Sequence, residues 1–251
     1  MVAKRIIPCL DVKEGRTVKG VNFVGLQDVG DAVELGRMYA AQGADELVYL
    51  DISATHEGRN TFTSLVERIA RGINIPFTVG GGISSIDDAA RLLDVGADKI
   101  SINSAAVRRP QLIDEIASKY GSQFVVLAID AKMVDGRWCI TTHGGRRLTE
   151  RELFDWAREG QERGAGEILL TSMEHDGTRS GYPCDLFARL SQQLSIPIIA
   201  SGGAGSADDI AEVLSAGRAD AALAASIFHY GDITVRELKR MLHNRGIKVR
   251  L

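Results

Sequence analysis

Residues 198–205 read Ile-Ile-Ala-Ser-Gly-Gly-Ala-Gly, a short β-branched run that ends directly in glycines. Such a run predicts a strand followed by a turn with bare backbone N–H groups, because glycine has no Cβ to hold a ligand away. An earlier copy, Phe-Thr-Val-Gly-Gly-Gly-Ile, occupies residues 77–83, and an Ile-Pro pair precedes each copy. A serine and two aspartates follow each copy and indicate a helix N-terminus. The duplication predicts two anion sites, of the kind that bind phosphate.

Apolar strands and helices alternate along the whole chain. The pattern predicts strands over 6–12, 46–51, 76–79, 99–103, 124–130, 167–171, 197–201 and 221–224. It predicts helices over 32–42, 62–72, 87–95, 111–120, 150–163, 185–194, 208–216 and 235–243. Residues 14–30 are too polar and glycine-rich for one element and are predicted to form a long loop, and Asp135-Gly136 predicts a hairpin turn.

Eight strands that alternate with eight helices indicate a parallel sheet covered by helices. At 251 residues the economical prediction is a single (β/α)8 TIM barrel, one domain over residues 1–251. An internal repeat supports it: Gly43-Ala44 recurs as Gly164-Ala165, and Gly82 recurs as Gly203, both 121 residues later. The chain is therefore predicted to be two fused half-barrels. The alternative, an open doubly wound sheet, has a single switch point and does not account for two equivalent glycine turns.

Composition narrows the class of protein. Hydrophobic residues make up 45% and charged residues 25%, which argues against disorder. A net charge of −3 argues against a nucleic-acid surface, so the ligand is predicted to be small. The three cysteines form no CxxC pair, and no apolar run has the length of a signal or membrane segment. We therefore expect a cytoplasmic protein with no membrane contact, no metal and no cofactor.

Two aspartates close equivalent strands of the two halves. Asp11 ends the first strand and Asp130 ends the fifth, and barrel active sites lie where strands end. Each aspartate alone is as easily a loop cap, but a symmetric pair at one mouth suits general acid and base catalysis. We therefore predict that Asp11 and Asp130 are the catalytic residues.

Charged residues are also expected at the opposite rim. Side chains alternate along a strand, so Arg5 shares the inward face with Asp11, Lys99 with Asn103, and Glu167 with Thr171. Glu46 is the repeat partner of Glu167. Charges at this depth are tolerated only when they pair with one another. The set is either a structural plug or a functional gate.

Six stretches carry a resemblance to a known family. They are 5–13 (Arg-Ile-Ile-Pro-Cys-Leu-Asp-Val-Lys), 79–83 (Val-Gly-Gly-Gly-Ile), 98–103 (Asp-Lys-Ile-Ser-Ile-Asn), 176–178 (Asp-Gly-Thr), 200–203 (Ala-Ser-Gly-Gly) and 222–229 (Ala-Leu-Ala-Ala-Ser-Ile-Phe-His). Together they resemble the cyclase subunit of imidazole glycerol phosphate synthase, from histidine biosynthesis. The resemblance extends over the whole chain.

The resemblance implies a reaction. Ammonia attacks the ribulosyl arm of an aminoimidazole-carboxamide bisphosphate and yields imidazole glycerol phosphate and aminoimidazole carboxamide ribotide. It also implies that Asp11 and Asp130 are the general acid and base, in an order that the sequence leaves open. Residues implied to bind the substrate and its two phosphates are Lys19, Gly82, Asn103, Ser104, Thr171, Asp176, Gly177, Gly203, Ala225 and Ser226.

The resemblance also implies a partner. A glutamine amidotransferase subunit would dock on the N-terminal face of the barrel as a heterodimer, with Asp98 as a candidate docking residue. Its ammonia would reach the mouth along the barrel axis, past Arg5, Glu46, Lys99 and Glu167. One departure is visible: Tyr182 is followed by Pro183-Cys184-Asp185, where the family commonly has aspartate directly after the tyrosine. This puts the role of Asp185 in doubt.

Two alternative functions stay open at this point. A sister barrel that isomerises the preceding pathway intermediate shares the repeat, both aspartates and both phosphate sites. It uses no ammonia and needs no charged gate, so the set at the opposite rim argues against it. A catalytically silent sugar-phosphate-binding barrel would be expected to lack one mouth aspartate, and both are present.

Overall fold

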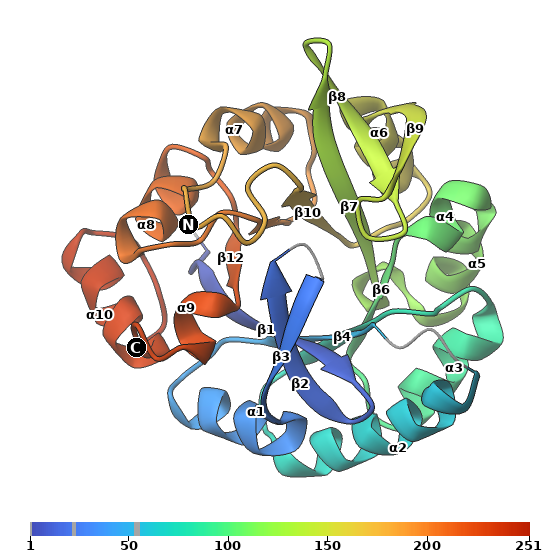
Figure 1. Ribbon diagram of the computed structural model, residues 1–251. Helices are drawn as coiled ribbons and strands as arrows, with labels where there is room; N and C mark the ends of the chain where they lie inside the picture. The colour runs from blue at the N-terminus through green and yellow to red at the C-terminus, as the bar shows by residue number, and fades with distance from the viewer. Residues whose placement is uncertain (1, 22–23, 53–55) are drawn as a thin grey trace.

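The computed structural model describes residues 2–21, 24–52 and 56–251, with side chains outside 19–26 and 56–61. Within this part of the chain, eight parallel strands form a closed barrel inside a ring of helices (Figure 1). The barrel strands, in order around the ring, are β1 (Arg5–Lys13), β4 (Leu47–Asp51), β5 (Phe77–Gly80), β6 (Lys99–Ile102), β7 (Val125–Val134), β10 (Glu167–Ser172), β11 (Ile198–Ser201) and β12 (Ala221–Ala224).

Closure of the ring is direct. β1 pairs in parallel with β12, with Arg5 opposite Ala221, and with β4, with Asp11 opposite Leu50. The two halves meet again where β6 pairs with β7, with Ile102 opposite Leu127, and β7 in turn pairs with β10, with Asp130 opposite Thr171. The predicted (β/α)8 barrel is confirmed, and the open doubly wound alternative is wrong.

Helices cover the outside of the barrel. The long ones are α1 (Ala32–Ala41), α2 (His56–Gly72), α3 (Ile86–Asp94), α5 (Gln111–Tyr120), α6 (Leu153–Glu162), α7 (Cys184–Gln193), α8 (Ala207–Ser215) and α10 (Val235–Asn244). Two short helices, α4 (Ser104–Arg108) and α9 (Ser226–His229), and a 3₁₀ turn at Ser122–Phe124 were not predicted, because they are too short to show helical periodicity. Among the described residues, none of these helices combines the length and the apolar character needed to span a membrane.

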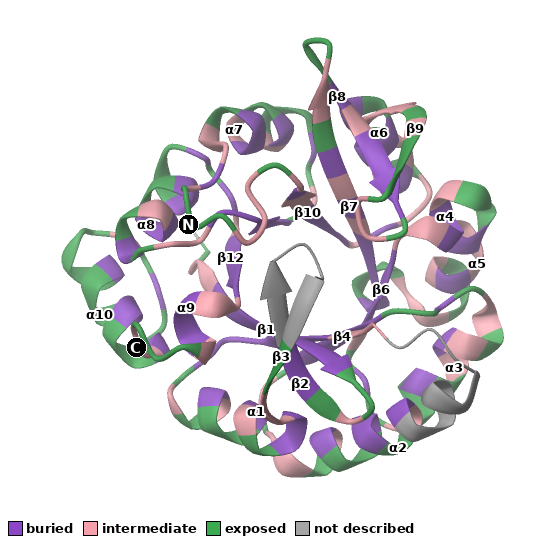
Figure 2. Ribbon diagram, in the orientation of Figure 1, coloured by how far each residue is buried: buried purple, intermediate pink, exposed green. Residues whose placement is uncertain are grey.

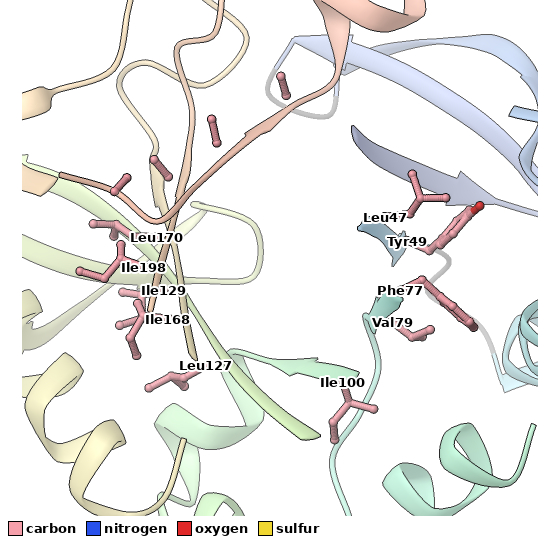
Figure 3. Close-up of a cluster of buried hydrophobic side chains, with 14 of the residues drawn as sticks. Leu47, Tyr49, Phe77, Val79, Ile100, Leu127, Ile129, Ile168, Leu170 and Ile198 are labelled. Carbon is pink, nitrogen blue, oxygen red and sulfur yellow. The ribbon is translucent and has the colours of Figure 1, made fainter. Parts of the chain in front are cut away.

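Alternation along the strands creates two separate cores. Outward side chains such as Leu47, Tyr49 and Phe77 pack between the strands and the helices (Figure 3). Inward side chains such as Val48 and Leu169 form a smaller cluster inside the barrel. Figure 2 shows the matching pattern on the helices, whose buried residues face the strands while exposed residues face outward. A barrel interior filled by side chains is the expected state of this fold.

The predicted long loop over 14–30 is wrong. β2 (Arg16–Val21) and β3 (Val24–Asp31) form an antiparallel hairpin there, and β2 also pairs with β1, with Asp11 opposite Val18. The hairpin continues from the end of β1 that carries Asp11 (Figure 1). Its strands are not part of the barrel wall. The segment therefore lacks the apolar run by which the barrel strands were recognised.

The predicted hairpin at Asp135-Gly136 is confirmed. β7 pairs antiparallel with β8 (Arg137–Thr142), and both turn residues have positive φ, 48° and 77°. A further strand, β9 (Arg147–Glu152), pairs with β8 and was missed. The helix predicted from residue 150 therefore begins only at Leu153, where the Glu152 side chain accepts hydrogen bonds from the N–H groups of Phe154 and Asp155.

Candidate active site

A cavity of about 480 Å³ lies at the carboxyl-terminal ends of the barrel strands. All but one of the residues predicted for catalysis and substrate binding line this cavity. They are Asp11, Gly82, Asn103, Ser104, Asp130, Thr171, Asp176, Gly177, Gly203, Ala225 and Ser226. The exception is Lys19, which lies in β2 with its backbone opposite Gln27 and whose side chain falls outside the described residues. The fold therefore brings residues from both halves of the chain to one place.

The two aspartates both line this cavity and come from opposite sides of the barrel. Asp11 comes from β1 and Asp130 from β7, which lies four strands away around the ring in either direction. Asp11 is buried, and Asp130 is partly exposed to the cavity. The amide Nδ2 of Asn103 donates a hydrogen bond of 3.0 Å to Oδ2 of Asp130. Asn103 therefore fixes the orientation of the Asp130 carboxylate.

The protonation of Asp130 is set by its surroundings. Burial raises the pKa of Asp130 to about 6, with the negative charge of Asp176 acting in the same direction and the Asn103 hydrogen bond opposing it. A carboxyl group with this pKa exchanges its proton close to neutral pH. This is the property that a general acid or base requires.

The first predicted anion site combines a glycine turn with a short helix. Gly81 and Gly82, after β5, have φ of 101° and 68°, and a Cβ on Gly81 would lie 2.1 Å from the Asp51 carbonyl oxygen. Beside this turn, α4 begins after Asn103, which makes no side-chain cap. The first N–H groups of a helix have no intrahelical acceptor. The site therefore offers backbone donors to an anion.

The second predicted anion site repeats this construction. Gly202 and Gly203, after β11, have φ of 88° and 120°, and a Cβ on Gly203 would lie 2.1 Å from the Gly181 carbonyl oxygen. α9 begins after Ala225, which also makes no side-chain cap. The φ and ψ of Ala225, −125° and −70°, resemble the −129° and −94° of Asn103.

The N-terminal N–H groups of the helices that follow the glycine turns are less available to an anion than the sequence suggested. Ser85 accepts a hydrogen bond from the Asp88 N–H at the start of α3, and Ser206 does the same for Asp209 at the start of α8. These N-termini are therefore capped within the chain. The bare donors are those of the glycine turns and of α4 and α9.

Four charged side chains form a ring inside the opposite end of the barrel. Arg5 Nη1 lies 2.7 Å from Glu46 Oε1, and Arg5 also pairs with Glu167. Lys99 Nζ lies 3.0 Å from an oxygen of Glu46 and 3.0 Å from an oxygen of Glu167. Burial opposes ionisation of Glu46, yet Arg5 and Lys99 together lower its pKa. Each carboxylate is thus held between the two cations.

Asp98, the candidate docking residue, has a structural contact of its own. Its Oδ2 accepts a hydrogen bond of 3.0 Å from the Phe77 N–H at the start of β5, although the residue is exposed. Asp220 accepts the same bond from Ile198 at the start of β11 in the other half. This shared role gives no local signal in the sequence, because the partner residue lies 21 or 22 positions earlier in the chain.

Other residues of the cavity were also missed. Gly144 lies in the turn between β8 and β9, and the neighbouring His143 N–H donates to Ser104 Oγ at 3.1 Å. Arg108 and Arg179 line the cavity as well. Only the position of Arg179, directly after residues 176–178, gave a signal in the sequence. Among the described residues no cluster of His, Cys, Asp and Glu is suited to hold a metal ion.

Comparison with known proteins gives consistent matches. A family model described as "Histidine biosynthesis protein" matches residues 5–234. The imidazole glycerol phosphate synthase subunit HisF of Bacteroides thetaiotaomicron is 61% identical over 250 residues, and that of Bacteroides fragilis is 60% identical over 250 residues. The protein of the same name from Flavobacterium johnsoniae is 59% identical over 251 residues. Each match covers 100% of this chain and 100% of the relative.

The raised pKa of Asp130 makes a prediction about stability. In the unfolded chain this carboxyl ionises near its ordinary pKa of 3.8, whereas in the folded protein it keeps its proton to about pH 6. The folded state therefore binds more protons in this window, so stability falls as pH rises through it. Asp130→Asn removes this loss, and we expect it to raise the free energy of unfolding by about 1–3 kcal/mol near pH 7.5.

Urea unfolding near pH 7.5 and near pH 4.5 measures this effect, and the gain should shrink at the lower pH. Asp135→Asn is the matched control, because Asp135 is exposed in a hairpin turn whose positive φ asparagine also adopts. Equal stabilities of wild type and Asp130→Asn at both pH values would contradict the raised pKa.

Proposed function

The chain belongs to the family of histidine biosynthesis proteins, and from this premise we propose how its cavity performs the cyclase reaction of imidazole glycerol phosphate synthase. The activity itself follows from relatives named as HisF subunits that match the chain at full length. The observation that carries the proposal is the arrangement of the mouth. Asp11 and Asp130 line one cavity together with two glycine turns and two short uncapped helices of the same construction.

The substrate is a bisphosphate in this proposal, with one phosphate in each anion site. Gly82, Asn103 and Ser104 bind one end, and Gly203, Ala225 and Ser226 bind the other. The cavity volume of about 480 Å³ falls within the range of small-molecule sites. We assign contacts with the middle of the substrate to Thr171, Asp176, Gly177 and Lys19. Binding of both phosphates would hold the reacting atoms of the substrate between the carboxylates of Asp11 and Asp130.

Ring closure with ammonia requires protons to be moved. Ammonia loses protons as it bonds to carbon, and the oxygen that leaves must gain one. Asp130, with a pKa near 6, both accepts and donates a proton near neutral pH. Asp11 supplies the second proton-transfer group from the opposite side of the mouth. The names of the relatives favour this reaction over the sister isomerase, and two carboxylates in one cavity favour it over a silent binding barrel.

The relatives are named as subunits, so the chain works as part of a complex. We propose that the partner is a glutamine amidotransferase on the N-terminal face, near Asp98, and that its ammonia enters through the charged ring. Four ion pairs close the ring, and the Lys99 side chain is somewhat more exposed than that of Arg5, at 20% against 15%. Lys99 is therefore the cation proposed to move. The cytoplasm is the proposed location, which the metabolic role of the named relatives supports.

Residues 1–251 are proposed to act as one cyclase domain. The pairing of β1 with β12 supports this, because strands from opposite ends of the chain complete the same barrel.

The catalytic assignment predicts that Asp11→Asn and Asp130→Asn each lose ammonium-dependent turnover by at least about 10²-fold, because asparagine keeps the shape but exchanges no proton. Turnover of the bisphosphate with ammonium salts measures the loss, and circular dichroism checks the fold. Asp135→Asn again serves as the control and should retain full activity. Turnover like that of wild type in either cavity variant would remove that aspartate from the mechanism.

If the charged ring is a gate for ammonia, Lys99→Ala should have a different phenotype. Because Lys99 lies far from the mouth, ammonium-driven turnover should stay within about twofold of wild type. With the partner present, glutamine should be hydrolysed without matching product, since the ring no longer controls passage. The ratio of glutamate to imidazole glycerol phosphate measures this coupling. An unchanged ratio would leave the ring as a structural plug, and glutamine-dependent synthesis by the chain alone would contradict the partner.

A further inference from the structure

The two anion sites differ in the cations beside them. Among the described residues that line the cavity, the cations are Arg108 and Arg179. Arg179 forms an ion pair with Asp232, so its charge already has a partner. The Arg108 side chain makes no ion pair or hydrogen bond with any other described residue, although it lines the same cavity. A positive charge without a counter-ion therefore lies at the cavity wall.

The position of Arg108 on α4 places it at the first anion site. Arg108 follows Ser104 by four residues, so the two lie on one face of the helix. Long side chains on a helix lean toward its N-terminus, which here is the end that carries Ser104. Both residues line the cavity, together with Gly82. The guanidinium therefore extends toward the donors of this site.

The next residue shows that this orientation is specific. Arg109 is also exposed, but it pairs with Glu115 on α5 and does not line the cavity. The two neighbouring arginines therefore carry the same charge toward different surroundings. Arg109 makes an ion pair between two helices, whereas Arg108 lines the cavity.

The second half of the barrel lacks an equivalent of Arg108. Ser226 corresponds to Ser104 in the repeat, and the residue four positions later is Tyr230, which is exposed. The cation of the second site, Arg179, is partly neutralised by Asp232. The two halves thus share the glycine turns and short helices but differ in the charge beside them.

We propose that Arg108 is a phosphate-binding residue of the first anion site and makes this site the stronger anchor for the bisphosphate. The proposal rests on the proposed function, since it assigns a phosphate to this site. A guanidinium binds phosphate through two N–H groups at once, which adds a charge-assisted contact to the backbone donors. Arg108 acts on binding and takes no part in proton transfer.

The test compares Arg108→Gln with Arg109→Gln, which remove the same charge from adjacent exposed positions. With saturating ammonium, Arg108→Gln should raise the KM for the bisphosphate by about tenfold and leave kcat within about twofold, as expected for the loss of a solvent-accessible charge-assisted contact. Arg109→Gln should leave both constants unchanged. Arg108→Lys keeps the charge but loses the fork, so its KM should fall between those of wild type and Arg108→Gln.

Binding of inorganic phosphate gives a second readout that needs no turnover. Phosphate should raise the thermal midpoint of wild type and of Arg109→Gln more than that of Arg108→Gln. An unchanged KM in Arg108→Gln, a fall in kcat alone, or equal phosphate protection of all three proteins would overturn the role of Arg108. A wild-type protein that fails to turn over the bisphosphate with ammonium would instead overturn the proposed function.

Discussion

Hydrogen bonding of β1 to both β4 and β12 closes the barrel, and the placement of the functional groups depends on this closure. One face of β1 carries Arg5 at one end and Asp11 at the other, separated by about 20 Å at ~3.3 Å per residue. Between them lies the inner cluster, with Ile7, Cys9 and Leu169. The charged ring and the carboxylates are thus the two ends of one apolar interior. This geometry is what a route for a small neutral molecule requires.

The repeat determines how the mouth is shared. Each half supplies one aspartate, one glycine turn and one short uncapped helix, and the ring places the two sets on opposite sides of the cavity. A substrate with a phosphate at each end matches this arrangement, because its centre then lies between the carboxylates. The two halves also differ from each other. Asn103 donates to Asp130, and Arg108 stands where the second half has Tyr230.

The sequence predicted the barrel well because its strands are apolar runs between short polar connections, and the 121-residue repeat showed both halves. The β2–β3 hairpin was missed because its strands lie outside the barrel and lack such a run. The last three residues of β9 were read as the start of a helix, since Arg147–Glu152 contains only one apolar residue, Leu148. The position of Asp11 and Asp130 in one cavity was predictable from strand ends. The raised pKa of Asp130 was not, because it depends on burial and on Asp176, which comes from a different βα loop.

The central claim is that two separate phosphate sites hold one substrate across the pair formed by Asp11 and Asp130. Titration calorimetry of the wild-type chain with the bisphosphate, and with each of its two monophosphate halves, tests this most directly. When two linked groups bind two sites, the second contact forms at a high effective concentration. The account predicts that the bisphosphate binds at least about 100-fold more tightly than either half. A half that binds as tightly as the whole bisphosphate would contradict it.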